Sequence, residues 1–599
     1  MKAFRYVIYA VIDLQLDGIL HIGNGDDDSI GLAVNSQGQY IIPATGFAGP
    51  VRHGIGEKSD ANDSNNKYDK YFGSSEGDDS RIYFYDAVCE DTYVEKRTGV
   101  KIDSRLGTAE DKYLYNTYYL GDGMTTSIRL QAFAADQKEK KALIGISGDD
   151  AARCPASESA NKAMDKSSQD SADESVGVIG EIIGEIASGR ITFGAKTGIG
   201  AGRFKITGVR TRVLDLTNIE DRNSYLGGVK AMFDSCAPDQ KLNKIAQEKE
   251  EEIPDFRLTA IIPDGLLVKS GDLSDIANDV NMNRAKHGRS GDEAKNADGG
   301  VGNSDINIEE NESEYFIPGS TMKGLFRSYA ETICHAKGLS DEKTDALVIA
   351  LFGNKNEKKD SKAGDAADKV DEEKVSVVKN EPPRRAGKLR FSDVVIHKPC
   401  KVIHPRIKID RWLGGTFETA KMSEELLSTK GEDSFDIDVS VNVQDDPYLM
   451  SAANAFIFLT CRDLARGLIP IGSGSSEGLG RLQGKKLFAK GGKYTFDGDG
   501  RVKMTDGSES ANSFSEIQSW LGTLNKLCCD NYGDDTQNKF CGENTVDNQS
   551  DTVVAQTEKW WEELIEHSLR GDKRKKAGKG MRLGNQKKQA DPKGSRKGA

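Results

Sequence analysis

The chain has 599 residues, a net charge of −13, 37% hydrophobic residues and 64 glycines. That length exceeds one ordinary hydrophobic core, so we expect two or more domains interrupted by solvated insertions. The early apolar run YVIYAVIDLQL is interrupted by Asp13 and is too short to cross a bilayer, so neither a signal peptide nor a membrane partner is expected. The nine cysteines show neither metal-ligand spacing nor a disulfide pattern, which is typical of a reduced, cytoplasmic protein.

In chain order, the same series of motifs occurs twice. Residues 1–235 contain VIDLQLDGILHIGNG, QYIIPATGFAGPVRHG, RIYFYDAVCED, RTGVKIDSRLGTAEDK and FGAKTGIGAGRFKI. Residues 256–490 contain RLTAIIPDGLLVKSG, EYFIPGSTMKGLFRSYAETI, KLRFSDVVIHK, HPRIKIDRWLGGTFET and IGSGSSEGLGRLQG. The matched anchors are Pro43 with Pro318, Asp86 with Asp393, Asp103 with Asp410, Gly202 with Gly480, and Arg203 with Arg481. Five motifs in one order indicate an internal duplication.

The remaining segments differ from the repeat in composition. Short alternating strands with single helices and glycine-rich turns predict an α+β fold built on antiparallel sheets in each copy. Residues 236–255 are predicted to be an acidic linker, residues 491–569 a helical appendix, and residues 570–599 a basic disordered tail. Polar insertions near 148–177, 275–310 and 354–385 account for the differences in spacing between the copies. The tail holds twelve Lys/Arg against two Asp, which fits either a polyanion contact or a solubilising role.

The second Ile-Pro motif predicts an anion seat. Ser320 or Thr321 is suited to cap a helix, and Lys323 and Arg327 then lie on one face beside free backbone amides. The alternative is a capped helix with a solvated basic face. Neither glycine loop is a phosphate-binding loop of the Gly-Lys-Ser/Thr type, which disfavours a nucleotide-dependent enzyme.

The early strand ending in His-Ile-Gly, the Ile-Pro-Gly-Ser-x-x-Lys-Gly-x-x-Arg motif, the Phe-x-Asp strand and the late Gly-x-Gly-Arg loop resemble the RAMP superfamily of CRISPR-associated proteins. Within it, the match is to the repeated backbone subunits of type III effector complexes, here two fused in one chain, over about residues 3–215 and 256–487. In the first copy Ala44 and Ala48 replace the motif's Gly and Lys while Arg52 remains, so a weaker phosphate grip is expected there.

The resemblance implies two tandem ferredoxin-like (RRM-like) domains with inserted loops, each a palm with a β-hairpin thumb that holds guide RNA. It also implies an antiviral ribonucleoprotein whose partners are guide RNA (crRNA), target RNA and other CRISPR effector subunits. Arg97 is expected near RNA in the first thumb; an ordinary solvated hairpin is the alternative. The residues expected to bind RNA are Arg52, Lys101, Arg105, Arg203, Ser320, Lys323, Arg327, Arg406, Lys408, Arg411 and Arg481.

The resemblance further implies that an aspartate before the Ile-Pro motif cleaves target RNA with a divalent metal, Mg²⁺ by preference. Such a carboxylate positions the metal or helps deprotonate the 2′-hydroxyl. The first-copy candidates are Asp28, then Asp26 and Asp27; the second-copy candidate is Asp305, ahead of Asp275. Asp28 and Asp305 are the expected metal ligands. Two alternatives stay open. One is a scaffold whose aspartates are solvated turns, and the other is a metal-independent guide-processing nuclease that uses His21, His53 or His404.

Overall fold

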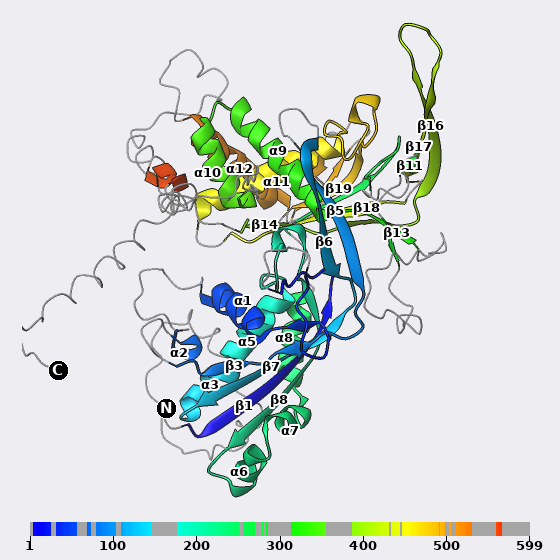
Figure 1. Cartoon of the computed structure of the whole chain (residues 1–599). Helices are drawn as coiled ribbons and strands as arrows, with labels where there is room; N and C mark the ends of the chain where they lie inside the picture. The colour runs from blue at the N-terminus through cyan, green and yellow to red at the C-terminus, as the bar shows by residue number, and fades with distance from the viewer. Residues whose placement is uncertain are drawn as a thin grey trace, which may run out of the picture. The chain divides into compact units, whose positions relative to one another are not determined.

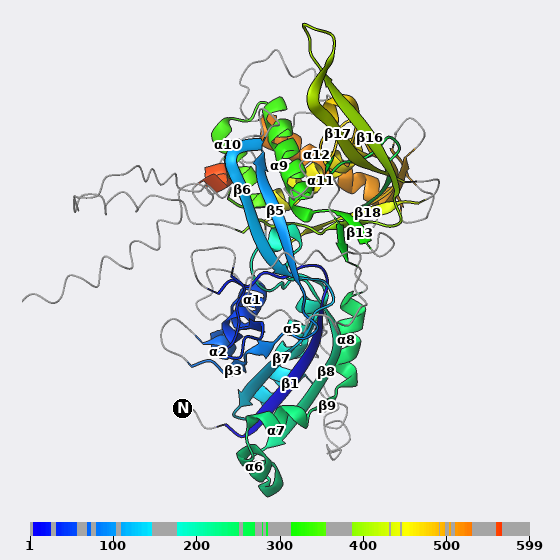
Figure 2. The same ribbon diagram turned by 45° about the vertical axis from the view of Figure 1, so that its right-hand side comes forward.

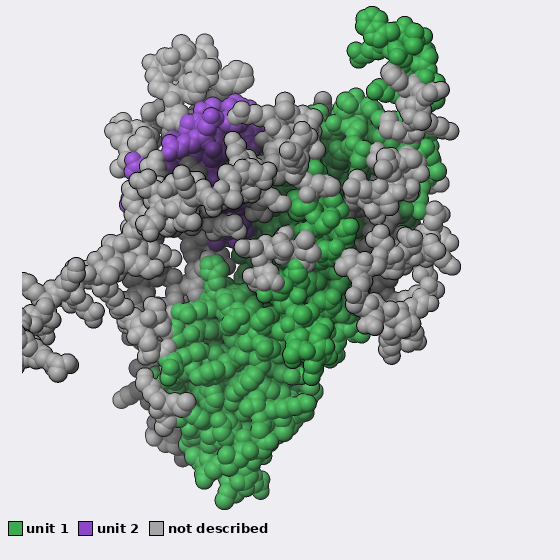
Figure 3. Space-filling view, in the orientation of Figure 1, with its two compact units in different colours: residues 1–328, 389–521 green, residues 329–388, 522–599 purple. Residues whose placement is uncertain are grey.

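A computed structural model of the chain was analysed. It describes residues 4–24, 31–56, 69–73, 79–102, 109–145, 176–250, 255–269, 278–279, 283–285, 313–354, 386–429, 433–443, 446–489, 492–496, 502–504, 510–529, 559–562 and 564–565. The chain divides into two compact units (Figure 3). Unit 1 comprises residues 1–328 and 389–521 and therefore contains both copies of the repeat. Unit 2 comprises residues 329–388 and 522–599.

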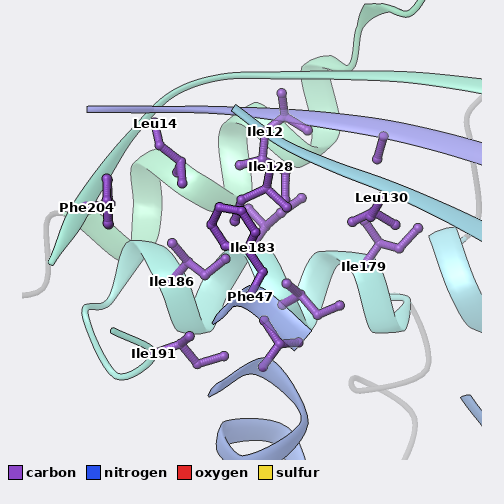
Figure 4. Packing of buried hydrophobic residues seen from close by; sticks show 14 of the residues in the cluster. Ile12, Leu14, Phe47, Ile128, Leu130, Ile179, Ile183, Ile186, Ile191 and Phe204 are labelled. Carbon is purple, nitrogen blue, oxygen red and sulfur yellow. The ribbon is translucent and has the colours of Figure 1, made fainter. Parts of the chain in front are cut away.

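The first copy is organised around a five-stranded sheet with the strand order β3-β7-β1-β8-β9. The central strand β1 (Tyr6–Leu16) is antiparallel to both neighbours, β7 (Thr125–Ala134) and β8 (Phe204–Asp215). Side chains alternate along a strand. On one face of β1 they pack with helices α1 (Ala44–Gly56), α5 (Val178–Ala187) and α8 (Gln240–Glu250). Figure 4 shows this core, with Phe47 and Ile183 between the sheet and the helices.

The opposite face of β1 is also covered. Val7, Tyr9 and Val11 pack against Met232 and Phe233 of α7 (Val229–Asp234). The sheet is therefore buried on both faces at its centre, which explains the nearly continuous apolar run at the start of the chain. The other elements of the first copy are β2 (Ile41–Ile42), α2 (Asp69–Phe72), β3 (Ile82–Phe84), β4 (Ala87–Val88), α3 (Gln137–Ile144), α6 (Ile219–Leu226) and β9 (Ala237–Pro238).

The second copy repeats the arrangement in a six-stranded sheet with the order β14-β18-β10-β19-β20-β21. Its central strand β10 (Phe256–Ile261) is antiparallel to β18 (Phe435–Val441) and β19 (Gln483–Ala489), as β1 is to β7 and β8. Strand β14 (Leu389–Phe391), which carries the Phe-x-Asp motif, extends this sheet as β3 extends the first. The predicted α+β architecture with antiparallel sheets is confirmed.

A long β-hairpin leaves each sheet, and Figures 1 and 2 show both. In the first copy β5 (Val94–Ile102) pairs with β6 (Ala109–Leu120). In the second copy β16 (Cys400–Ile409) pairs with β17 (Thr416–Ser428). Both lie at the Lys-Ile-Asp motifs that the sequence assigned to hairpins. The other elements are β11 (Asn278–Asp279), β12 (Asn283–Ala285), β13 (Ser313–Ile317), α9 (Gly319–Ala336), β15 (Val394–Ile396), α11 (Pro447–Ala465), β20 (Gly492–Phe496), β21 (Val502–Met504) and α12 (Ser510–Cys529).

Unit 2 contains α10 (Asp341–Phe352), the ends of α9 and α12, and a short helical segment around Trp561. Ser340 caps α10 by accepting the Lys343 amide, and the Lys343 ammonium lies 5.1 Å from the centre of the buried Trp561 ring. The unit is therefore held by packing within its own short helices.

Two segments carry more structure than their composition indicated. Helix α8 lies within the predicted acidic linker, and its Leu242 and Ala246 are buried in the first core. Strands β20 and β21 lie within the predicted helical appendix and extend the second sheet. Among the described residues, no helix combines the length and apolarity that a membrane crossing requires.

Candidate nucleic-acid interface

The two Phe-x-Asp motifs have one structural task in both copies, which is to cap the helix of the Ile-Pro motif. Asp393 accepts the Gly319 amide at 2.9 Å, and Asp86 accepts the Ala44 amide at 2.7 Å. A carboxylate here complements the positive end of the helix. The predicted cap by Ser320 or Thr321 is corrected, because α9 already begins at Gly319 and its first amide is bound by Asp393, which lies between β14 and β15.

The glycine loops also have the same geometry in both copies. A single 3-10 turn, η2 (Thr197–Ile199) or η6 (Ser475–Glu477), lies between two residues in the left-handed region. Gly202 and Gly480 follow with φ of 78° and 76°. A Cβ at these positions would lie 1.8 Å from the Phe193 carbonyl oxygen and 1.9 Å from that of Ile471. Only glycine fits, so the repeated Gly-x-Gly spacing has a steric cause.

Two partly buried lysines lie around the first glycine loop. Lys196 precedes η2, and its ammonium donates to Thr117 Oγ1 at 2.8 Å and lies 5.4 Å from the centre of the Tyr119 ring. A Cβ at Gly198 would lie 2.9 Å from the ammonium of Lys323 on α9, so the absence of a side chain there admits this lysine. The two lysines therefore come from different copies of the repeat: Lys196 lies within the loop, and Lys323 approaches the loop at Gly198.

Burial lowers the pKa of Lys196 to about 8, and burial together with the nearby Arg327 lowers the pKa of Lys323 to about 8. A buried cation that is short of negative neighbours gains stabilisation when an anion binds beside it. A nucleic-acid phosphate supplies that charge. The sequence singled out Lys323 but missed Lys196, whose signal was a basic residue inside a glycine loop.

The first hairpin carries an arginine whose expected role is corrected by the structure. Arg97 is only 8% exposed, and its guanidinium donates to both carboxylate oxygens of Asp393, at 3.0 and 2.7 Å, and to Glu95 at 2.6 Å. Burial alone would lower the pKa of Arg97, but the two carboxylates raise it above its ordinary value. Arg97 thus binds the second copy rather than RNA.

The second hairpin presents a different surface. Arg406 is paired with Glu424 at 2.8 Å and donates to Glu477 of η6 at 2.8 Å, so its charge is compensated within the chain. Near the tip, Asp410 accepts the amide of Trp412 at 2.7 Å, which orders the turn. Trp412 is 94% exposed, and Lys408 is also exposed. An exposed ring beside cations is suited to stack on an unpaired base.

The structure places the other predicted RNA-binding residues as follows. Arg52 is exposed on α1, and Ser320 is exposed on the first turn of α9. Arg203 forms an ion pair with Asp17 at 3.3 Å, and Arg481 donates to the Gly467 carbonyl at 2.6 Å. Arg411 is exposed at the tip of the second hairpin. The side chain of Lys101, and Arg105, Asp26, Asp27, Asp28, Asp275 and Asp305 altogether, lie outside the described part of the structure.

The three candidate histidines separate into one buried and two exposed side chains. His21 is 6% exposed, its Nδ1 lies 2.8 Å from the Tyr118 carbonyl oxygen, and burial lowers its pKa. These contacts fit a neutral ring that fastens the first hairpin to the segment that follows β1. His53 lies exposed on α1, and His404 lies exposed on β16.

Carboxylates are the ligands that Mg²⁺ prefers, so the predicted aspartates have suitable chemistry for the implied metal. Within the described ranges, no group of three or more His, Cys, Asp or Glu side chains is arranged to hold a metal ion. The described residues support anion binding around Lys196 and Lys323.

Comparison with known proteins adds the family. No curated protein matches the sequence. A chain in a solved structure described as the "Cryo-EM structure of the Type III-B Cmr-beta bound to cognate target RNA" matches with 14% identity and a TM-score of 0.24. The match covers 35% of this chain and 61% of that chain, less than two thirds of its length, and a likeness at this score supports no structural conclusion.

The family model of the RAMP superfamily matches residues 13–205 and again residues 268–483. Together these regions make up more than half of the chain, and each falls within one copy of the repeat. The predicted resemblance and the predicted duplication are both confirmed. The chain belongs to the RAMP superfamily and carries the family's domain twice.

Proposed function

We propose that the chain is a guide-RNA-binding backbone subunit of a type III CRISPR effector complex, built from two tandem ferredoxin-like domains. One observation carries the proposal: Lys196 lies within a glycine loop, the ammonium of Lys323 approaches the same loop at Gly198, and each lysine has a pKa lowered to about 8. Phosphate is the anion that a basic site of this kind would bind along a nucleic-acid strand. The exposed aromatic tip at Trp412 supports contact with bases.

The proposal extends to cleavage of the target RNA that pairs with the guide. Asp28 in the first copy and Asp305 in the second would hold Mg²⁺, with Asp26 and Asp27 as neighbouring candidates. The metal would supply charge stabilisation for the displaced oxygen. In this assignment the chain works in the cytoplasm with guide RNA, target RNA and other effector subunits. A scaffold that binds guide RNA without cutting is the alternative outcome of the same experiment.

The test assembles the chain on guide RNA with its partner subunits and adds complementary labelled RNA and Mg²⁺. Wild type is compared with Asp28→Ala, Asp305→Ala and the double variant. Loss of a distinct set of cuts with each substitution, while guide binding is retained, would support one metal-dependent site in each copy. Intact binding with no cutting by wild type would support the scaffold. Cutting of a guide-RNA precursor that persists without Mg²⁺ and is lost in His404→Ala would support metal-independent processing.

A further inference from the structure

The contact between the two copies shows which surfaces of one RAMP domain bind the neighbouring domain in this chain. The hairpin and glycine loop of the first copy lie against the Phe-x-Asp strand of the second. Arg97 forms its bidentate pair with Asp393, in which both side chains are at most 9% exposed. The guanidinium also lies 4.7 Å from the centre of the Phe316 ring. Arg390 of the second copy donates to the Arg190 carbonyl of the first at 2.6 Å.

The first copy has the same receiving surface, and nothing in the described part of the chain covers it. Asp86 occupies the position of Asp393 and holds its helix amide in the same way, yet it is exposed. Tyr83 takes the place of Arg390 and is 45% exposed, and the nearby Val88 is 38% exposed. Asp393 and Arg390 lie in the contact between the copies, whereas the equivalent residues of the first copy, Asp86 and Tyr83, are exposed. Repeat proteins that end at such a face normally present a polar surface there.

The hairpin and glycine loop of the second copy differ from those of the first at the positions that make the contact between the copies. Aligning the Lys-Ile-Asp motifs puts His404 at the position of Arg97, so this hairpin presents no guanidinium there. Its own Arg406 is already paired with Glu424 and Glu477. Glu477 stands where the first copy has Ile199, whose carbonyl oxygen lies near the helix start of the second copy. In a stack of identical chains, Glu477 would therefore approach Asp86, and like charges would meet.

We propose that the surface of the first copy defined by Asp86, Tyr83 and Val88 is a docking site for a β-hairpin of a different polypeptide that presents an arginine, and that a second copy of this chain is excluded from it. The arginine would form with Asp86 the bidentate pair that Arg97 forms with Asp393, and the hairpin would cover Tyr83 and Val88. The inference deepens the proposed function by naming the partner's chemistry, but it rests on the contact between the copies and not on RNA.

The experiment uses the full chain without RNA, so its result is independent of guide binding. The probe is a labelled chain that carries three substitutions. His404→Arg and Glu477→Ile give the hairpin and loop of the second copy the residues that the first copy has at these positions. Asp86→Lys prevents the probe from acting as an acceptor through its own first copy. Its binding to unlabelled wild-type chain is measured by sedimentation. A second labelled chain carrying only Asp86→Lys reports what the natural hairpin does.

We expect the restored probe to bind wild type at least tenfold more tightly than the natural hairpin does. Binding should be lost when the acceptor carries Asp86→Asn, which keeps an oxygen to accept the Ala44 amide and so spares the helix cap. An acceptor carrying Glu220→Gln on the exposed first turn of α6 should bind like wild type. Equal binding of both probes would overturn the arginine requirement. Self-association of the wild-type chain that depends on Asp86 would overturn the exclusion of a second copy.

Discussion

Replacing Arg97 with Met should destabilise the second copy strongly although the substituted residue belongs to the first. The Met side chain keeps most of the volume beside Phe316 but removes the charge. Asp393 and Glu95 would then remain buried, with side chains 8% and 11% exposed, and without their cation. Breaking a buried ion pair by removing one partner costs about 3–5 kcal/mol, because the remaining charge is uncompensated. We expect a loss in that range.

The assay is equilibrium urea unfolding followed by tryptophan fluorescence. All four tryptophans lie after residue 411, so the signal reports unfolding of the second copy and the regions that follow it. Trp520 packs against Phe256 of the second sheet, with ring centres 6.0 Å apart. The double variant Arg97→Met/Asp393→Asn should recover part of the loss, because Asn retains an oxygen for the Gly319 amide and carries no charge. A coupling of at least about 1 kcal/mol between the two sites is expected.

The matched control is Arg257→Met, which breaks an arginine–aspartate ion pair of similar geometry that is more exposed to solvent. Arg257 donates to Asp438 at 2.7 Å, with side chains 38% and 27% exposed. Water screens such a pair, so its loss should cost about 1 kcal/mol or less. If Arg97→Met and Arg257→Met shift the unfolding transition equally, the buried contact between the copies is refuted.

Other predictions concern the loops, the helix and the hairpin tip. Guide RNA affinity should fall about tenfold per lysine between pH 7 and pH 9, because Lys196 and Lys323, each with a pKa of about 8, lose their protons in that window. Lys323→Arg should reduce this fall, since a guanidinium stays charged. The same dependence of affinity on pH in the variant and in wild type would contradict the assignment. Gly480→Ala should prevent the glycine loop from closing and so lower the midpoint of thermal unfolding. Gly324→Ala, which places a methyl group in open space on α9, should instead raise the free energy of unfolding by about 0.5–1 kcal/mol. Equal thermal midpoints for the two variants would contradict the steric reasoning. Trp412→Ala should weaken RNA binding measured by fluorescence anisotropy and leave the unfolding transition unchanged, while a loss of stability would show that the ring is packed.

The sequence predicted an α+β fold with antiparallel sheets because short alternating strands and glycine-rich turns are local patterns, but it did not predict the strand order, since strands such as β7 and β18 carry none of the repeated motifs. The duplication predicted the equivalent hairpins and glycine loops because their motifs are local patterns as well. The role of the Phe-x-Asp motif could not be predicted, since its partner amide lies 74 positions away in the sequence and is brought near only by folding.

The candidate site was predictable in part. Lys323 follows from the helix motif, because its position near the start of α9 is set by local geometry. Arg97 looked like a surface cation because its acceptor, Asp393, is 296 positions away and on the other copy. Lys196 was missed because its burial depends on Thr117 and Tyr119 of a hairpin that the sequence does not place beside it. Burial of a charge is a tertiary property, and single-sequence patterns carry little information about it.

The central claim is that the two partly buried lysines, Lys196 and Lys323, hold the phosphates of a guide RNA. The most direct measurement is the dissociation constant of the full chain for single-stranded guide RNA as a function of salt, for wild type, Lys323→Gln and Lys196→Gln, with Lys244→Gln on the exposed face of α8 as the control. Each site variant should bind more weakly and should reduce the slope of log affinity against log salt by about 0.7, while the control should leave both unchanged. Slopes that are the same for all four proteins would contradict the claim.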